Sequence, residues 1–199
     1  MKLAIMGGTF NPVHIGHLVC AEEAVSQYGL DRVLFMPTGL PPHKEIQNGA
    51  GPEDRYRMCV LAIGGNPRFE VSRYEIDKQQ VSYTVNTVRH FRRQMPEAEL
   101  YFITGADAVL EILEWKDPQD LLMMATLIAA TRPGYPLDKI SGSLSRFLTE
   151  NRVKIMEIPG IGVSSTMIRR RVSERMSIRY LVPEGIRQYI NKEGLYRQE

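Results

Sequence analysis

The sequence predicts a doubly wound parallel α/β sheet. Short runs that are apolar or alternate in polarity recur six times, and helix-like stretches lie between most of them. Such alternation is typical of parallel strands with helices packed on both faces of the sheet. Glycine-containing or polar segments follow several of these runs, and binding sites in this architecture lie beyond the carboxyl ends of the strands.

The elements follow one another in a regular order along the chain. The predicted strands are residues 3–6, 32–36, 69–76, 100–104, 127–131 and 153–158. The predicted helices are residues 16–28, 53–63, 84–94, 107–113, 137–149 and 183–192. A proline- and glycine-rich stretch at 38–52 is predicted to be a long loop, a kind of segment that is often functional. We expect one domain over residues 1–199, with a helical C-terminal part from about residue 164.

The composition excludes several classes of protein. The 199 residues suffice for one sizeable core, and 25 basic against 23 acidic side chains give a net charge of +2. This balance argues against a general nucleic-acid or membrane-surface binder, so any anion site must be local. Cys20 and Cys59 have no metal-ligand spacing and are expected to be buried thiols.

No segment predicts export or membrane insertion. The short apolar run before Asn11 is too brief for a signal peptide, and the mostly apolar residues 121–130 fall well short of a bilayer span. We therefore expect a cytoplasmic protein, for which a homo-oligomer is possible.

The most informative segment is Gly-Gly-Thr-Phe-Asn-Pro-Val-His-Ile-Gly-His at residues 7–17. It follows the first predicted strand and opens the first predicted helix. Glycines let the backbone approach a ligand closely, and amides at a helix start favour an anion. His14 and His17 are three residues apart and share a helix face, where imidazoles can donate to phosphoryl oxygens. The alternative is a glycine turn with surface histidines, but such a turn requires neither Pro12 nor both histidines.

Two later segments add candidate phosphate contacts. Lys44 lies on the predicted loop after the second strand, where its ammonium could reach a phosphate or simply be solvated. Ser164, Ser165, Thr166 and Arg169 follow the last strand and open a helix. The serines could cap that helix, or hydroxyls, amides and the Arg169 guanidinium could converge on a polyphosphate.

Two further residues have open interpretations. Asp107 follows the fourth predicted strand, and its carboxylate could accept hydrogen bonds from ribose or cap a helix. Trp115 is the single tryptophan of the chain and could either pack structurally or stack on an aromatic base.

Together these segments resemble the bacterial nicotinate mononucleotide adenylyltransferases. The ordered matches are GGTFNPVHIGH, PPHK, SYT, GAD, W, RPG and SSTMIR, and they run from Gly7 to Arg169. The HxGH pattern alone identifies only a nucleotidyltransferase superfamily with a Rossmann-like fold; the full order narrows the resemblance. Two departures are visible: Lys116 follows Trp115 where many relatives carry an aromatic residue, and Asn11 stands where aspartate is usual.

The resemblance implies a role for each matched position. His14, His17, Lys44 and Arg169 would be catalytic. The ATP-binding set would be Gly7, Gly8, Thr9, Phe10, His14, His17, Asp107, Ser164, Ser165, Thr166 and Arg169. Lys44, Thr84, Trp115 and Arg132 would bind the mononucleotide.

The expected reaction transfers AMP from ATP to nicotinate mononucleotide, releasing pyrophosphate and giving deamido-NAD for NAD biosynthesis. Mg²⁺ would be bound mainly through the ATP phosphates. Two alternatives remain: another small adenylyl- or cytidylyltransferase, such as a pantetheine-phosphate adenylyltransferase, or a nucleotide-binding regulator without turnover.

Overall fold

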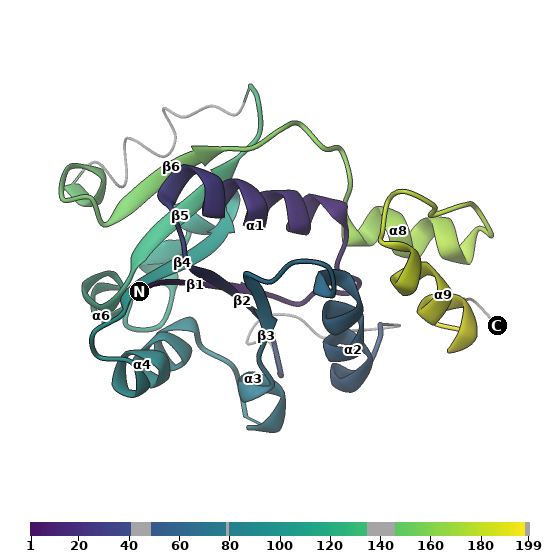
Figure 1. Ribbon diagram of the computed structural model, residues 1–199, viewed down its shortest axis with the longest axis horizontal. Coiled ribbons are helices and arrows are strands. Elements are labelled where there is room, and N and C mark those ends of the chain that lie inside the picture. Colours follow the sequence, from purple (N-terminus) through teal and green to yellow (C-terminus); the bar gives the residue numbers. More distant parts are fainter. Residues whose placement is uncertain (41–48, 79, 135–145, 198–199) are drawn as a thin grey trace.

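A six-stranded, all-parallel sheet forms the centre of the protein (Figure 1). The computed structural model describes residues 1–40, 49–78, 80–134 and 146–197. The strands are β1 Lys2–Gly8, β2 Arg32–Pro37, β3 Phe69–Val71, β4 Glu99–Gly105, β5 Thr126–Thr131 and β6 Val153–Glu157, in the order β3-β2-β1-β4-β5-β6. The predicted doubly wound parallel sheet is confirmed.

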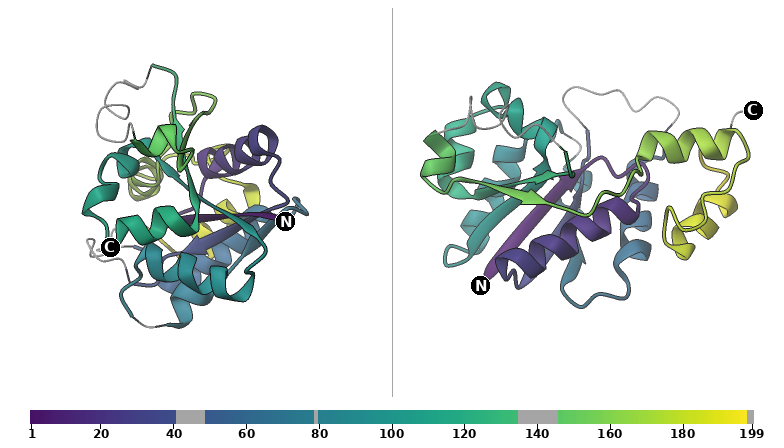
Figure 2. Two further views of the ribbon diagram at one scale, coloured as in Figure 1. Left: turned by 90° about the vertical axis from the view of Figure 1, so that its left-hand side faces the viewer. Right: turned by 90° about the horizontal axis from the view of Figure 1, so that it is seen from above.

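Helices cover both faces of this sheet (Figure 2). They are α1 Ile15–Tyr28, α2 Pro52–Ile63, α3 Tyr74–Asp77, α4 Thr84–Gln94, α5 Ala106–Leu110, α6 Pro118–Met124, α8 Ser165–Ser173 and α9 Glu184–Lys192, with a 3₁₀ turn, η1, at Ile112–Glu114. Successive side chains of a strand point to opposite faces. In β1, Ala4 and Met6 accordingly pack with α1, α2, α8 and α9, whereas Leu3 and Ile5 pack with α4, α5 and α6.

The order of the strands decides where a site can form. β1 pairs with β2 on one side and with β4 on the other. The chain therefore builds the sheet outward from β1 to one edge through β2 and β3, and then to the opposite edge through β4, β5 and β6. The connections that leave these two strands go to opposite faces, which leaves a crevice at the carboxyl ends of β1 and β4.

The prediction of one strand over residues 69–76 was wrong beyond Val71. β3 pairs with β2 over three residues, and the Ser72 N–H closes the pairing on the Phe35 carbonyl at 2.9 Å. The Ser72 hydroxyl then accepts from the Tyr74 N–H, and α3 begins. Ser72 and Arg73 interrupt the apolar alternation, and within α3 the buried side chain is Glu75.

The region after β4 also differs from the prediction. Residues 107–113 form α5 and η1 instead of one helix, because Glu111 leaves the helical conformation and the tighter turn packs Ile112 beside Val109. Helix α6 was missed. Its signal was the dipeptide Asp117-Pro118, since proline is favoured in the first turn of a helix.

Parts of two other predictions lie outside the described residues. Residues 146–149 are helical, but the rest of the predicted helix 137–149 falls mostly in the undescribed segment 135–145. The predicted loop 38–52 includes residues 41–48, which are likewise outside the description, and Lys44 with them. Within the described part of the chain, no helix is long and apolar enough to cross a membrane.

The C-terminal helices pack against the same core as the sheet. Ile168 of α8 and Ile186 and Ile190 of α9 are fully buried in the cluster that contains the α1 side chains. The Ile15 N–H, at the start of α1, donates to the Leu181 carbonyl at 3.1 Å. The C-terminal part therefore helps to hold the beginning of α1 in place.

Candidate active site

A cleft of about 470 Å³ opens at the carboxyl ends of β1, β4 and β5, at the crevice described above. Predicted site residues from four separate segments line it: Gly7, His14, His17, Asp107, Arg132 and Ser164. In the described part of the chain, the predicted residues Gly8, Thr9, Phe10, Thr84, Trp115, Ser165, Thr166 and Arg169 lie outside its lining.

The two histidines form a stacked pair at the start of α1. Their ring centroids are 3.7 Å apart with an interplanar angle of 25°. The His14 N–H donates to Nδ1 of His17 at 3.1 Å. A neutral His17 therefore carries its proton on Nε2, because Nδ1 acts as the acceptor. The ring of Phe10 meets His17 edge-on at 5.0 Å and limits its rotation.

Both imidazoles are neutral at pH 7. Burial lowers the pKa of His14 to about 4, with a smaller effect from the nearby positive charge of Arg132. Burial also lowers the pKa of His17 well below its usual value, and His14 adds to this effect. Each ring thus offers one N–H donor without bringing a positive charge of its own.

The segment after β6 contacts the turn after β1 directly. The Ser165 hydroxyl donates to the Pro12 carbonyl at 2.8 Å, and Nη1 of Arg169 donates to the Asn11 carbonyl at the same distance. A second Arg169 nitrogen contacts the Thr166 hydroxyl at 3.3 Å. The two motifs are in contact, and the contact is made through the backbone carbonyls of residues 11 and 12.

Ser164 adopts the capping role that the sequence left open. Its hydroxyl accepts from the Met167 N–H at 3.2 Å and caps α8, while the residue also lines the cleft. Asp107 is not the N-cap residue of α5. Gly105 occupies that position, and Asp107 lies in the first turn of the helix. Its carboxylate is exposed at the rim of the cleft.

Asn11 acts through its amide oxygen. This oxygen accepts from the Ala50 N–H at 3.1 Å and from the Tyr196 hydroxyl at 2.7 Å. The side chain thus joins the turn after β1 to the residues before α2 and to the C-terminal end of the described chain. Both contacts need only an acceptor, so an aspartate could make them as well.

Two of the predicted mononucleotide residues, Trp115 and Thr84, lie outside the lining of the cleft. Trp115 packs edge-on against Phe102, with ring centroids 6.2 Å apart. Phe102 in turn covers Gly7, where a Cβ atom would lie only 2.8 Å from its ring. Thr84 is the first residue of α4, and Lys116 places its ammonium 4.6 Å from the centre of the neighbouring Tyr83 ring. Lys116 therefore packs on an aromatic ring without displacing Trp115 from Phe102.

Sequence reasoning missed Arg55, which contacts the turn after β1. Its guanidinium is fully buried and donates to the Thr9 carbonyl at 2.9 Å. The sequence contained a signal for this residue, because Arg55 has the helical spacing of the apolar residues Met58 and Cys59. All three lie on the buried face of α2, where a charged residue is unusual.

Comparison with known proteins identifies similar sequences over the whole chain. Residues 5–171 match the family model described as cytidylyltransferase-like. A protein of Moorella thermoacetica named probable nicotinate-nucleotide adenylyltransferase is 50% identical, over 98% of this chain and 92% of the relative. A protein of Rubrobacter xylanophilus with the same name is 46% identical, over 100% of this chain and 94% of the relative.

Solved structures share the fold. The Plasmodium falciparum nicotinic acid mononucleotide adenylyltransferase complexed with NaAD superposes with a TM-score of 0.79 at 16% identity, covering 98% of this chain and 97% of that one. The same enzyme complexed with APC gives a TM-score of 0.77, also at 16% identity, over 98% of this chain and 96% of that one.

The depressed pKa of His14 predicts a specific loss of stability in mild acid. Between pH 6.5 and about 4 the unfolded histidine binds a proton that the folded one does not, so stability falls as pH decreases through this window. From pH 7.5 to 5 this contributes a loss of about 2 kcal/mol. Urea unfolding at the two pH values should show it in the wild type, and His14→Gln should lose correspondingly less. Equal pH dependence in both proteins would contradict the prediction.

Proposed function

Because this chain belongs to the cytidylyltransferase-like family, among its nicotinate-nucleotide adenylyltransferases, we propose that it transfers AMP from ATP to the 5′-phosphate of nicotinate mononucleotide. The products are deamido-NAD and pyrophosphate. The observation that best supports this reaction is the His14–His17 pair in a cleft that is rimmed by Asp107 and Arg132 at the strand switch point.

The acceptor supplies its own nucleophile. A phosphate monoester has a second pKa near 6 and is mostly a dianion at neutral pH, so it needs no strong protein base. This requirement agrees with the low pKa values of His14 and His17, which make the imidazoles hydrogen-bond donors and not cationic acids. One oxygen of the acceptor phosphate attacks the α-phosphorus of ATP, and the bond to pyrophosphate breaks.

The protein contributes position and charge stabilisation. We assign the Nε2–H of His17 to the phosphoryl oxygens, because Nδ1 is already held by the His14 N–H. Arg132 would contact the mononucleotide phosphate, and Lys44, which lies outside the described residues, would add a cation. Asp107 would accept from ribose hydroxyls. The Ser164 hydroxyl caps α8. A phosphate at this position would contact the backbone amides at the start of α8.

ATP would enter as its magnesium complex. The donors that line the cleft are imidazoles, a guanidinium and hydroxyls, a set that suits the anionic phosphates. Among the described residues no group of three His, Cys, Asp or Glu side chains could hold a metal ion. Mg²⁺ would be bound mainly through the ATP phosphates and would supply Lewis-acid chemistry there.

His17→Ala is expected to lower kcat by about 10²–10³-fold with a smaller change in the KM for ATP, because its donor matters most as charge develops on the transferring group. Acceptor-dependent pyrophosphate release measures both constants. His90→Ala is the control, since His90 stacks on Tyr74, away from the cleft. Near-normal turnover of a folded His17 variant would remove this residue from the mechanism.

Arg169→Lys is expected to raise the KM for ATP or lower kcat. A lysine cannot donate to both the Asn11 carbonyl and the Thr166 hydroxyl, so the two phosphate segments should separate. Arg170→Lys is the matched control, because its exposed side chain pairs with Glu174 on the same helix. If both variants behave alike, the Arg169 contacts are not required for activity.

The acid form of the acceptor should be preferred over the amide. The amides at the start of α4, with Thr84, suit a carboxylate, and Trp115 can hold the pyridine ring. We expect kcat/KM for nicotinate mononucleotide to exceed that for nicotinamide mononucleotide by at least about tenfold.

Measuring pyrophosphate release with these two acceptors and with phosphopantetheine also decides between the candidate reactions. Pyrophosphate release with phosphopantetheine alone would favour the alternative transferase, and none with any acceptor would favour a binding protein.

A further inference from the structure

A tyrosine near the end of the described chain contacts the turn that precedes the histidines. The Tyr196 hydroxyl donates to the side-chain oxygen of Asn11 at 2.7 Å, and its other neighbour is Sδ of Met58, a weak acceptor 4.0 Å away. Burial raises the pKa of Tyr196, so the phenol keeps its proton at neutral pH and is the donor in this contact. Within the described part of the chain, the lining of the cleft does not include Tyr196.

Two left-handed residues bring Tyr196 to this position. After α9, Gly194 has a φ angle of 64° and Tyr196 one of 65°. The Leu195 N–H between them donates to the Ile190 carbonyl at 3.1 Å, which closes a turn at the end of the helix. Glycine adopts this conformation without steric cost, whereas for a tyrosine it costs free energy that surrounding contacts must offset. The packing of the chain therefore specifies where Tyr196 lies.

The turn after β1 is strained beside the histidines. Phe10 has a φ angle of 48°, which is uncommon for a bulky side chain, and its buried ring packs edge-on against His17. Such a conformation persists only where its surroundings hold it in place. Arg55 holds the Thr9 carbonyl on one side of Phe10, and the contacts of Asn11 hold the other side.

Asn11 is held through its side chain and through its backbone. The side-chain oxygen accepts from the Tyr196 hydroxyl and from the Ala50 N–H, and the carbonyl accepts from Nη1 of Arg169. Asn11 is also buried. A shift of Asn11 would therefore disturb Arg169, a candidate phosphate ligand, and the ring of Phe10 that packs on the second histidine.

The Tyr196 hydroxyl is not needed to satisfy a buried acceptor. If it is removed, the Ala50 N–H still donates to the Asn11 oxygen at 3.1 Å, so no acceptor loses its last partner. The ring of Tyr196 packs against the core, and a phenylalanine ring keeps that packing. Replacing Tyr196 by phenylalanine should therefore leave the fold intact and loosen only the hold on Asn11.

We propose that Tyr196 is a positioning residue that holds Asn11, and through it the strained turn that carries His14 and His17, in the geometry needed for adenylyl transfer. The proposal rests on the function proposed above. A misplacement of reacting groups by about 1 Å can cost on the order of 10²-fold in rate. A looser turn should therefore appear in turnover, and not only in stability.

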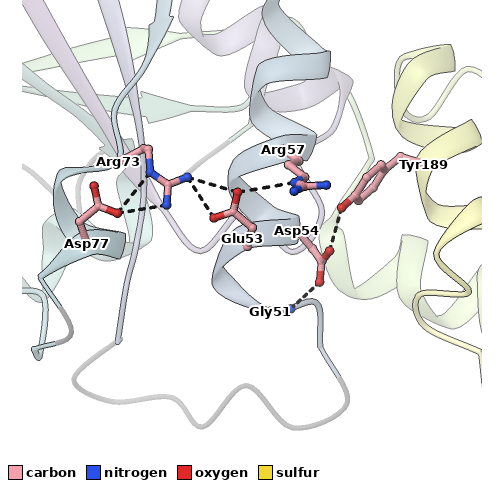
Figure 3. A network of polar contacts seen from close by, with 7 residues as sticks. All are labelled: Gly51, Glu53, Asp54, Arg57, Arg73, Asp77 and Tyr189. Carbon is pink, nitrogen blue, oxygen red and sulfur yellow. Dashed lines mark hydrogen bonds and ion pairs between the residues drawn. The ribbon is translucent and has the colours of Figure 1, made fainter.

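Tyr196→Phe tests the proposal, with Tyr189→Phe as the matched control. The Tyr189 hydroxyl of α9 donates to the Asp54 carboxylate at 2.8 Å, and this carboxylate also accepts from the Gly51 N–H at 3.3 Å (Figure 3). Each variant thus removes one hydroxyl from the C-terminal part and leaves its acceptor with one backbone donor. Only the Tyr196 hydroxyl contacts the turn after β1.

Both variants are compared with the wild type where urea unfolding shows all three to be folded. We expect Tyr196→Phe to lower kcat about tenfold and to raise the KM for ATP about threefold, and Tyr189→Phe to stay within about twofold in both constants. Unchanged constants in Tyr196→Phe, or equal losses in the two variants, would overturn the proposal, because a general role in stability affects both tyrosines alike.

Asn11→Ala supplies a second arm. It removes the acceptor of the same contact, so it should lower kcat at least as much as Tyr196→Phe, and the double variant should be no worse than Asn11→Ala alone. Multiplied effects in the double variant would show that the two residues act separately and would contradict the proposal. If Tyr196→Phe does not fold, Asn11→Ala decides, and a kcat within about twofold of the wild type overturns the proposal.

The proposed function and the role of Tyr196 can fail separately. If the wild type releases no pyrophosphate with any acceptor, the proposed function fails. Calorimetric ATP binding then judges Tyr196: binding about threefold weaker in Tyr196→Phe than in Tyr189→Phe supports its hold on the turn. Equal binding by the two variants overturns it.

Discussion

The buried turn that follows β1 is the constraint on which the rest of the site depends. Residues 10–14 are buried, and polar groups that are removed from water must find hydrogen-bond partners. Those partners come from distant parts of the chain: Arg55 on the Thr9 carbonyl, Arg169 on the Asn11 carbonyl, Ser165 on the Pro12 carbonyl, and Ala50 and Tyr196 on the Asn11 side chain. Helices α2 and α8 and the C-terminal residues are therefore fixed to the turn that carries the histidines.

Because of this arrangement, several residues have both a structural role and a proposed role in the cleft. Arg169 is a candidate phosphate ligand, yet its observed contacts hold the Asn11 carbonyl and Thr166. Ser164 caps α8 and lines the cleft. Because the same groups build the site and are proposed to face the substrate, replacing them changes geometry and charge together, and exposed neighbours such as Arg170 are needed to separate the two effects.

The charges of the cleft follow from burial as much as from residue type. His14 is buried near Arg132, His17 is half-buried beside it, and both stay neutral, whereas Arg132 and Asp107 are exposed at the rim. Neutral donors lie deep in the cleft and the full charges lie where water screens them. Such a site can take a polyanion without holding two cationic imidazoles against each other in the absence of substrate.

The sequence by itself determined the class of fold, most of the elements and the family. Strands buried on both faces are readable from the local pattern, and α4 was predicted with its observed bounds. The motifs at residues 7–17 and 164–169 are contiguous, so they too are visible in the sequence. Only the tertiary structure decided which residues complete the site. The end of β3 at Val71 depends on a pairing with β2, and the roles of Arg55 and Tyr196 depend on carbonyl and amide groups far away in sequence. The partners of a buried polar group are set by the packing of the whole chain, and no local pattern records them.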